Sequence, residues 1–428
     1  MKRFLALLIC LAALLSLAAC AAPPQETTAP ATRPSETQPT EPVDDYEYPE
    51  IKEKLTWEKI NSFPIKTSDM TVEEMRKLCV DFFRFTKSAL WTPKEDYKYY
   101  RNSVGDLDEF FRGTVYGSLP YVGLGTGNLY RLMDYLDEEK GVVDVKAAAK
   151  VPALFGNQCS IGSYWAWGRV INSVQKEAAT PHMYQANGYL RVGPYTYNDN
   201  RDKFTEDDNT VDICQANGEQ IMFQSYALMQ PADGLVQFTT AGHVMMCASV
   251  PHVEYIEGTD QIDGEKSYLY IIDQHKKWSE GTNESGDTYL YKNYVDRKMT
   301  FKKLFDSSYI PFTYAEFLGT DPIEETVCTF SHSGSTISVK DLFVANVTSN
   351  YGIADAYIIV KDTAGKEVYR HAIRAQVGGA KELPFAKIGG NVETWGTLDV
   401  SSGEFTVEIV VQLATGERPT VYTGKLVP

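Results

Sequence analysis

The spacing of hydrophobic residues predicts several helices before any chemistry is considered. Thr71 and Glu74 have the form of a capping box, and apolar side chains then recur at helical intervals. This pattern predicts a packing helix over residues 72–89. Shorter apolar runs predict three further segments: a helix over residues 129–138, a helix over residues 217–228 with Asn217 as its N-cap, and a closing helix and loop over residues 299–317.

Another helix pattern begins at a cysteine. A Gly-Asn turn at residues 156–157 precedes Gln158 and Cys159, and bulky apolar residues follow at helical spacing. These residues predict a helix with one buried face: Ile161, Tyr164, Trp165, Ile171 and Val174. Cys159 is therefore expected at a helix N-terminus, where backbone N–H groups and the helix dipole favour a thiolate.

Two later segments have the pattern of strands. A predicted strand over residues 242–246 carries His243 near its start. The next predicted strand, residues 268–275, ends in Asp273, Gln274 and His275. Because side chains alternate between the faces of a strand, the first and last of these three share one face and the middle one points to the other.

From about residue 325 the pattern changes to short alternating strands separated by turns, which predicts an antiparallel Ig-like β-sandwich. The chain as a whole is expected to be α+β. Its predicted parts are a signal peptide over residues 1–19, a lipidated Cys20 with a disordered linker over residues 20–50, a catalytic domain over residues 51–322 and an accessory sandwich over residues 323–428.

The N-terminus has the features of a bacterial lipoprotein signal. Lys2 and Arg3 precede an apolar run, and the Leu-Ala-Ala-Cys sequence that ends at Cys20 resembles a lipobox. The apolar run is short for a membrane span. We therefore expect a secreted lipoprotein, anchored through Cys20 on the outer face of the cell membrane, with a Thr- and Pro-rich spacer after the anchor.

The formal net charge of −16 argues against nucleic acid as a partner and permits substrates that carry ammonium groups. Glycines at positions 123, 125 and 127 lack the spacing and the Lys-Ser/Thr ending of a nucleotide-binding loop. No cofactor or metal is expected.

Five cysteines follow Cys20, and an odd number in an exported protein indicates at least one free thiol. Cys79 and Cys247 lie in apolar patterns and are expected to be buried in the core. Cys214 and Cys328 could pair, and the sequence leaves this open.

The strongest chemical signal is a cysteine with a histidine that could serve as its base. Of the six histidines, His243 is favoured because its strand can bring the imidazole to the edge of a sheet. A third polar group should orient the ring, as in other nucleophile-base sites. Asp273 is the first candidate, with His275 and Gln274 as alternatives.

Four sequence blocks carry a family resemblance: Gly-Ser-Leu-Pro-Tyr-Val-Gly at residues 117–123, Gln-Cys-Ser at 158–160, Pro-Ala-Asp-Gly-Leu-Val at 231–236 and Gly-His-Val at 242–244. In this order they resemble the signature of the NlpC-type and CHAP-type cell-wall cysteine hydrolases, over about residues 110–280. The resemblance implies a papain-like α+β domain in which the nucleophile helix packs on an antiparallel sheet that carries the base.

The resemblance also implies roles for individual residues. Cys159 matches the nucleophile, His243 the base and Asp273 the third polar residue, while Tyr121 matches a tyrosine that lies beside the nucleophile. In the CHAP-like pattern His275 replaces an asparagine. The other candidates for contacts to the substrate or its oxyanion are Gln158, Ser160 and Gln274.

The implied function is hydrolysis of peptide or amide bonds in peptidoglycan stems. Gln158 departs from the family pattern, where an acidic residue precedes the cysteine, and the gaps between the blocks are longer than usual. Two alternatives stay open: an acyltransferase or transglutaminase-like enzyme on the same fold, and a catalytically inactive surface binding lipoprotein.

Overall fold

The computed structural model describes residues 46–100, 107–122, 125–148, 156–172, 189–201, 204–205, 207–238, 242–375, 379–387 and 403–427. The predicted signal peptide, Cys20, Val174 and most of the predicted linker lie outside these ranges. Within the ranges, no helix is both long enough and apolar enough to cross a membrane.

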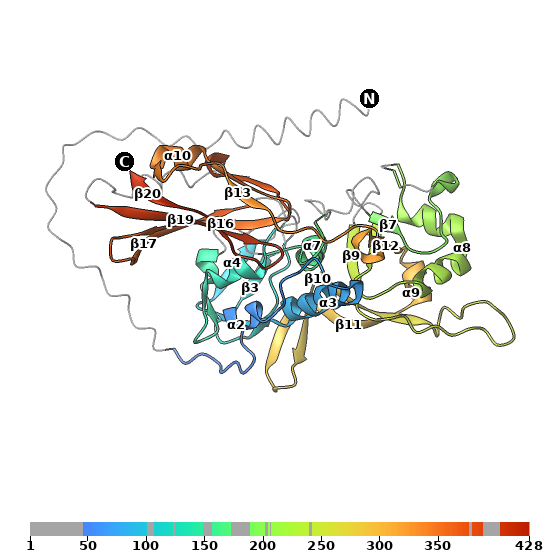
Figure 1. Ribbon diagram of the computed structural model, residues 1–428. Coiled ribbons are helices and arrows are strands. Elements are labelled where there is room, and N and C mark those ends of the chain that lie inside the picture. The colour runs from blue at the N-terminus through green and yellow to red at the C-terminus, as the bar shows by residue number, and fades with distance from the viewer. Residues whose placement is uncertain are drawn as a thin grey trace, which may run out of the picture. The chain divides into compact units, whose positions relative to one another are not determined.

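Helices and strands alternate along the first three quarters of the described chain (Figure 1). The helices are α2 (Trp57–Asn61), α3 (Val72–Ser88), α4 (Leu129–Met133), α5 (Val145–Ala148), α7 (Cys159–Trp167), η3 (Asn198–Asn200), α8 (Thr210–Ala227), α9 (Phe301–Asp306) and η4 (Glu316–Leu318). The strands are β1 (Leu90–Pro93), β2 (Tyr97–Tyr100), β3 (Leu107–Phe110), β4 (Tyr116–Gly117), β5 (Leu136–Asp137), β6 (Val142–Val143), β7 (Tyr189–Arg191), β8 (Gly234–Phe238), β9 (Gly242–Cys247), β10 (Tyr268–Thr282), β11 (Thr288–Thr300) and β12 (Ile310–Tyr314).

Most of these strands form one ten-stranded sheet in the order β5-β6-β1-β4-β11-β10-β9-β8-β12-β7. The run from β11 to β7 is antiparallel throughout. Parallel pairing occurs only nearer the other edge, where β1 meets β6 and β4 meets β11. The chain is therefore mixed α+β, with large sheets and few helices.

The long helix predicted from its capping box is confirmed. The Thr71 side chain accepts the Glu74 N–H, and the Glu74 carboxylate accepts the Thr71 N–H in return. This exchange satisfies backbone groups that a helix leaves unpaired at its start. The apolar face of α3 then packs against α7, β10 and β11.

Two of the predicted helical segments contain strands. The segment at residues 129–138 stops being helical at Met133 and continues into β5. The predicted closing loop contains a strand, β12, which pairs with β7 and β8. Apolar runs of this length fit a strand as well as a helix, so periodicity alone did not separate them.

Asn217 is not an N-cap. Helix α8 begins earlier, with Asn209 accepting the Asp212 N–H, and is interrupted at Gly218, whose φ of 75° is outside the helical range. Asn217 instead bonds to Thr196 through both its oxygen and its nitrogen. It ties α8 to the segment that follows β7.

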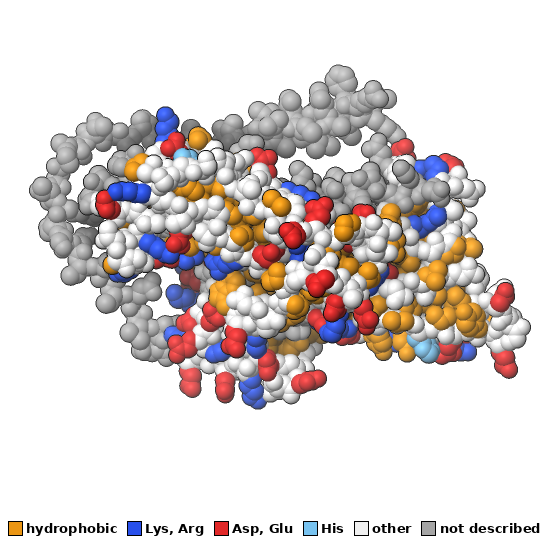
Figure 2. Space-filling model, in the orientation of Figure 1, with side chains coloured by type: hydrophobic (Ala, Val, Ile, Leu, Met, Phe, Trp, Pro, Cys, Tyr) orange, Lys and Arg blue, Asp and Glu red, His pale blue; other side chains and the backbone are white. Residues whose placement is uncertain are grey.

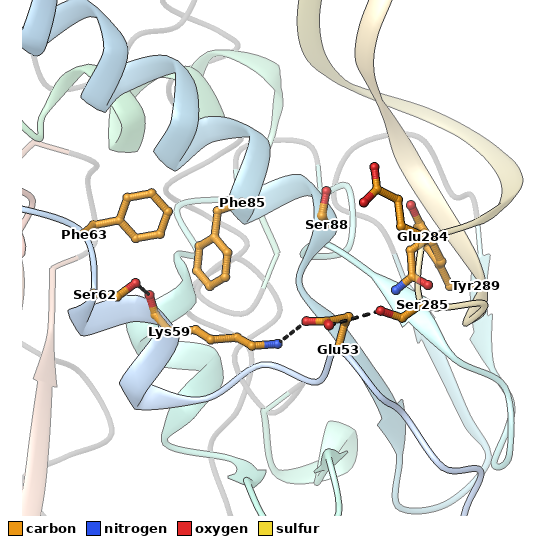
Figure 3. Close-up of a pocket in the computed structure, with 10 residues that line it drawn as sticks. Glu53, Lys59, Ser62, Phe63, Phe85, Ser88, Glu284, Ser285 and Tyr289 are labelled. Atoms are coloured by element: carbon orange, nitrogen blue, oxygen red, sulfur yellow. Dashed lines mark hydrogen bonds and ion pairs between the residues drawn. The ribbon is translucent and has the colours of Figure 1, made fainter.

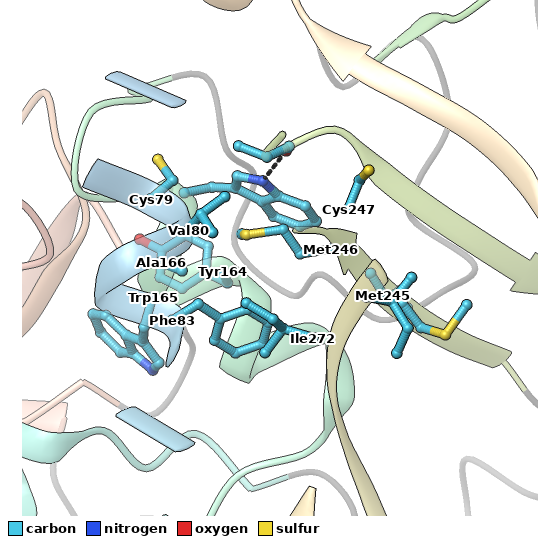
Figure 4. Close-up of a cluster of buried hydrophobic side chains, with 14 of the residues drawn as sticks. Cys79, Val80, Phe83, Tyr164, Trp165, Ala166, Met245, Met246, Cys247 and Ile272 are labelled. Carbon is cyan, nitrogen blue, oxygen red and sulfur yellow. Dashed lines mark hydrogen bonds between the residues drawn. The ribbon is translucent and has the colours of Figure 1, made fainter. Parts of the chain in front are cut away.

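Helix α7 is also buried more completely than its sequence predicts. All nine residues from Cys159 to Trp167 are buried, and the helix ends at Gly168 before it reaches Ile171. Side chains from α3 and β9 surround it (Figure 4). The prediction of a single buried face was wrong because another part of the chain covers the opposite face.

That covering part is the C-terminal region. It contains β13 (Cys328–Phe330), β14 (Thr336–Ser338), α10 (Val339–Val344), β15 (Asn346–Ser349), β16 (Ile353–Lys361), β17 (Glu367–Arg374), β18 (Glu382–Pro384), η5 (Phe385–Lys387), β19 (Phe405–Leu413) and β20 (Thr420–Val427). The strands form a five-stranded sheet, β14-β20-β19-β16-β17, and a three-stranded sheet, β13-β15-β18. Apolar side chains of both sheets share one core, as in a sandwich.

The sandwich packs directly on α7, and residues 48–428 form one compact unit. A Cβ at Gly352 would lie 1.8 Å from the Tyr164 Oη, and one at Gly379 would lie 2.7 Å from the Tyr164 ring. Glycine is therefore required at both positions for this approach. A Cβ at Gly168, just past the helix, would lie 2.9 Å from the Cβ of Ala414 in the sandwich.

A buried ion pair fixes the same interface. The Arg131 Nε lies 2.9 Å from the Asp355 Oδ1, and both side chains are almost fully buried. Arg131 also donates to the carbonyl oxygens of Ala354 and Ala375. Asp355 receives a second cation, Arg374, at 3.1 Å. Strand β16 is thus held to α4 by charged side chains that are removed from water and hydrogen-bonded to each other.

Arg131→Met should lower the free energy of unfolding by about 3–5 kcal/mol, because it leaves the buried Asp355 carboxylate short of a partner. Urea denaturation measures this change. The control is Lys361→Met, which removes a partly exposed pair with Glu408 and should cost only about 0–1 kcal/mol. Equal losses in the two variants would contradict a special role for the interface pair.

Candidate active site

The turn before the nucleophile helix is held by the segment that carries Tyr121. The Asn157 N–H donates to the Pro120 carbonyl at 3.0 Å, and the Val122 N–H donates back to the Asn157 carbonyl. A Cβ at Gly156 would lie 2.2 Å from a Val122 methyl group, so only glycine fits this approach. Two of the sequence blocks are therefore adjacent, and together they fix the start of α7.

Cys159 begins α7, with Gln158 as the N-cap residue, as the sequence predicts. His243 lies on β9 and Asp273 on β10, and these two strands are antiparallel neighbours. The His243 Nε2 lies 2.8 Å from the Asp273 Oδ2. The other carboxylate oxygen of Asp273 accepts the Tyr294 N–H at 3.1 Å. The carboxylate is therefore held from two sides and holds the imidazole in turn.

The same imidazole reaches the sulfur. His243 and Cys159 interact through a hydrogen bond and through their charges. Because Asp273 occupies Nε2, Nδ1 is the ring nitrogen available to Cys159. The structure thus brings together the three residues that the sequence separates by 84 and 30 positions.

Burial alone would favour the neutral thiol of Cys159. Two other effects oppose burial. They are the hydrogen bond and charge of His243, and the backbone N–H groups of Val244 and Ser160. Together they outweigh burial and lower the pKa of Cys159. A sulfur at a helix start that accepts backbone N–H groups is favoured as thiolate.

The histidine is shifted in the complementary direction. Burial opposes its charged form, but the hydrogen bonds to Asp273 and Cys159 and the negative charges of both raise the pKa of His243 to about 10. A lowered cysteine pKa and a raised histidine pKa describe one coupled state, the thiolate–imidazolium pair. This state supplies a nucleophile and a proton donor at neutral pH.

A second layer of polar groups lies beneath this pair. The Lys87 ammonium donates to the Gln274 side-chain oxygen, and the Gln274 nitrogen donates to the Leu119 carbonyl at 2.9 Å. A Cβ at Gly162 would lie 3.0 Å from the Lys87 nitrogen, so the glycine in α7 makes room for this charge. Burial lowers the pKa of Lys87 to about 7, although the charges of Asp273 and Cys159 favour its protonated form.

This lysine should give the fold a specific pH dependence. Because its folded pKa of about 7 is below the ordinary 10.5, the native state binds fewer protons than the unfolded chain between these values. The free energy of unfolding should therefore fall as the pH falls from 10.5 through 7, with Lys87 contributing on the order of 4 kcal/mol.

Denaturation curves across this pH range for the native chain and for Lys87→Met measure that contribution as a difference. The exposed Lys77→Met is the matched control and should keep the native slope. If the free energy of unfolding of Lys87→Met changed with pH as steeply as that of the native chain, Lys87 would be protonated in the folded protein as it is in water.

The remaining predicted site residues fall into two groups, and the first lies around the nucleophile. Tyr121 pairs with Asn157 in an isolated β-bridge, and Asn157 lies two residues before Cys159. Gln158 makes no side-chain bond to cap the helix. Ser160 is buried and offers the sulfur its backbone N–H, so its side chain is not placed to contact a substrate.

The second group lies on β10. Gln274 is fully buried and points to the layer beneath the site, which corrects its candidacy for substrate contact. His275 lies on the face of Asp273, as alternation predicts, and both line the same pocket. Its Nδ1 accepts the Lys277 N–H, and its ring lies 4.1 Å from that of Tyr294. Asp273, rather than His275 or Gln274, contacts His243.

The pocket beside His243 has a volume of about 410 Å³. Cys159 itself is only 4 % exposed, whereas the His243 side chain is 23 % exposed and forms part of the pocket wall. Tyr309 also lines the pocket, and burial together with the charges of Asp273 and Cys159 raises its pKa. The pocket therefore adjoins the base directly.

A second pocket, of about 430 Å³, lies between the α2–α3 region and the β10–β11 hairpin (Figure 3). Its wall includes Phe63, Phe85 and Tyr289. Of its charged residues, Glu53 and Lys59 bind each other at 2.7 Å, and Glu284 is the third. None of the predicted site residues lines it.

The reasoning from sequence missed Lys87 and Tyr309. Lys87 had a visible signal, because it follows Cys79 and Phe83 at helical spacing and so falls on the apolar face of α3. A charge on a core face needs a buried partner. Tyr309 had no such signal, since the sequence does not show that the turn before β12 returns to His243.

All five cysteines in the described residues are free, which answers the open question of Cys214 and Cys328. Cys79 and Cys247 are buried as predicted, and burial raises the pKa of each. Cys159 alone among the five has a lowered pKa. In the described part of the chain, no cluster of His, Cys, Asp or Glu has the arrangement of a metal site.

Comparisons with known proteins add no relative to this picture. No family model matches the chain, and neither the curated proteins nor the solved structures include a match.

Proposed function

We propose that this chain is a cysteine peptidase or amidase with a papain-like site, and that it hydrolyses peptide or amide bonds in peptidoglycan. One observation carries the proposal: His243 links the only cysteine of lowered pKa in the described chain to a buried carboxylate. Nucleophile, base and orienting group in this order are the parts that acyl transfer from an amide requires.

In the proposed mechanism the Cys159 thiolate attacks the carbonyl carbon of the scissile bond. The C=O electron pair moves to oxygen, and the Cys159 backbone N–H at the start of α7, with the Gln158 side chain, stabilises the oxyanion. The His243 imidazolium then gives its proton to the leaving nitrogen as the C–N bond breaks. Asp273 holds the ring in place throughout.

The second half of the reaction releases the acyl group. His243, now neutral, takes a proton from water while the water oxygen attacks the thioester carbon. Collapse of this intermediate breaks the C–S bond and returns the thiolate and the imidazolium. The Asp273 carboxylate stabilises the charged imidazole, which is present at the start of the first half and forms again in the second.

The substrate assignment rests on the family resemblance and on the predicted cell-surface position. A lipid on Cys20 and a polar spacer suit a substrate that surrounds the cell, and the four sequence blocks resemble enzymes of that substrate class. The sandwich in this proposal supports the nucleophile helix through Tyr164, so it belongs to the working unit.

Cys159→Ala should abolish release of shortened peptides from purified muropeptides, because no other group in the site can form the thioester. Mass spectrometry of the digest reads the result. Cys247→Ala, which removes a buried thiol outside the site, is the control and should keep activity. Activity retained in Cys159→Ala would refute the mechanism, and amine adducts formed from an added amine would indicate acyl transfer instead of hydrolysis.

The pH profile of kcat/KM should be bell-shaped, because only the thiolate–imidazolium pair reacts. Activity should rise as the pH passes the lowered pKa of Cys159 and fall as it passes the pKa of His243, about 10. Asp273→Asn removes a charge that raises the histidine pKa, so its alkaline limb should move down by about one pH unit or more. An unmoved limb would exclude Asp273 as the group that sets this pKa.

A further inference from the structure

The pocket beside His243 has a strongly positive wall. Besides the catalytic histidine and aspartate, it is lined by four cationic side chains, Lys276, Lys277, Arg297 and Lys303. The charge of Arg297 acts on pocket groups, since it contributes to the lowered pKa of His275 and partly opposes the raised pKa of Tyr309. Its positive field therefore reaches the interior of the pocket.

Two irregularities in one strand pair bring most of these cations to the site. On β10, residues 275–278 lie opposite a single residue of β11, and this bulge carries Lys276 and Lys277. On β11 a second irregularity, with Asp296 at a φ of 52°, precedes Arg297. Asp273 and Gln274 lie between the two bulges. Bulges beside active sites redirect side chains in this way.

The cations are not neutralised by the protein. Asp273 is the only carboxylate in the pocket wall, and it is bound to His243. Within the described ranges, none of the four cations forms an ion pair, whereas Lys59 in the other pocket is paired with Glu53. The chain carries a net charge of −16, and acidic side chains are spread over the face seen in Figure 2. A cluster of unpaired cations is therefore unusual on this protein.

His275 also lines the pocket, in its neutral form. Its Nδ1 accepts the Lys277 N–H, so the neutral ring carries its proton on Nε2. Burial lowers the pKa of His275 and outweighs a hydrogen bond with the Asn293 backbone, which acts in the opposite direction. The positive charge of the wall therefore comes from the lysines and the arginine.

The position of the pocket indicates which half of the substrate it receives. His243 lines it and Cys159 does not. In the proposed mechanism His243 delivers its proton to the leaving nitrogen, so a pocket that adjoins the histidine lies on the side of the leaving amine.

We propose, on the basis of the proposed function, that this pocket binds carboxylate on the leaving-amine half of the substrate. Arg297, Lys276, Lys277 and Lys303 supply the positive field that attracts the anion. The net acidity of the chain permits cationic substrates, but the local charge at the site selects an acidic peptide. Peptides that end in or contain free carboxylates next to the cleaved bond are the preferred class.

The test uses two thiol reagents of similar size, the anion iodoacetate and the neutral iodoacetamide. Their alkylation rates at Cys159 are measured at low salt, where charge effects are least screened. The ratio of the iodoacetate rate to the iodoacetamide rate should fall about 5- to 10-fold in Lys277→Gln/Arg297→Gln. The control, Lys340→Gln/Lys366→Gln in the sandwich, makes the same change of charge and should keep the native ratio.

Calorimetric titration with tricarballylate, a small tricarboxylate, gives a second measurement that does not need a reactive sulfur. The native chain and the sandwich variant should bind it, and the pocket variant should bind at least about 5-fold more weakly. Equal alkylation ratios and equal binding in the pocket and sandwich variants would overturn the proposal. Slow alkylation of Cys159 by both reagents would count against the proposed hydrolase, while the titration would still decide whether the pocket binds carboxylate.

Discussion

The site depends on keeping a thiolate, an imidazolium and a carboxylate together inside the protein. Charges removed from water are costly unless each has partners of the right sign and geometry. His243 meets this condition by contacting both Cys159 and Asp273, and Asp273 is bonded again by the Tyr294 N–H. The backbone N–H groups of Ser160, at the start of α7, and of Val244, on β9, also act on the sulfur. The rest of the structure positions these few groups.

Helix α7 is central to that positioning, and it is fixed from two sides. One side packs on β9, β10 and α3, while Tyr164 on the other side enters a space in the sandwich that only glycines leave open. The Arg131–Asp355 pair joins the same two regions. The sandwich is thus part of the support of the nucleophile, in addition to any surface it offers to other molecules.

The local parts of the site and the grouping of Cys159, His243 and Asp273 were predictable from sequence, whereas the other long-range contacts were not. A capping box predicted α3, the Gly-Asn turn placed Cys159 at a helix start, and alternation placed Asp273 and His275 on one face. The burial of α7 on all sides depends on contacts with sandwich residues such as Gly352 and Gly379, which lie far along the chain from Tyr164. The bulges in β10 and β11 depend on pairing register, which alternation cannot reveal. The papain-like identity and the catalytic roles stay predictions.

The central claim is that Cys159 is a thiolate at neutral pH because His243 is its charged partner. Titration of the ultraviolet thiolate absorbance, taken as the difference between the native chain and Cys159→Ser, measures this pKa directly. The account predicts a midpoint well below the ordinary 9.0, with a shift back toward it in His243→Ala. A midpoint at or above 9.0 in the native chain, as burial alone would produce, would contradict it.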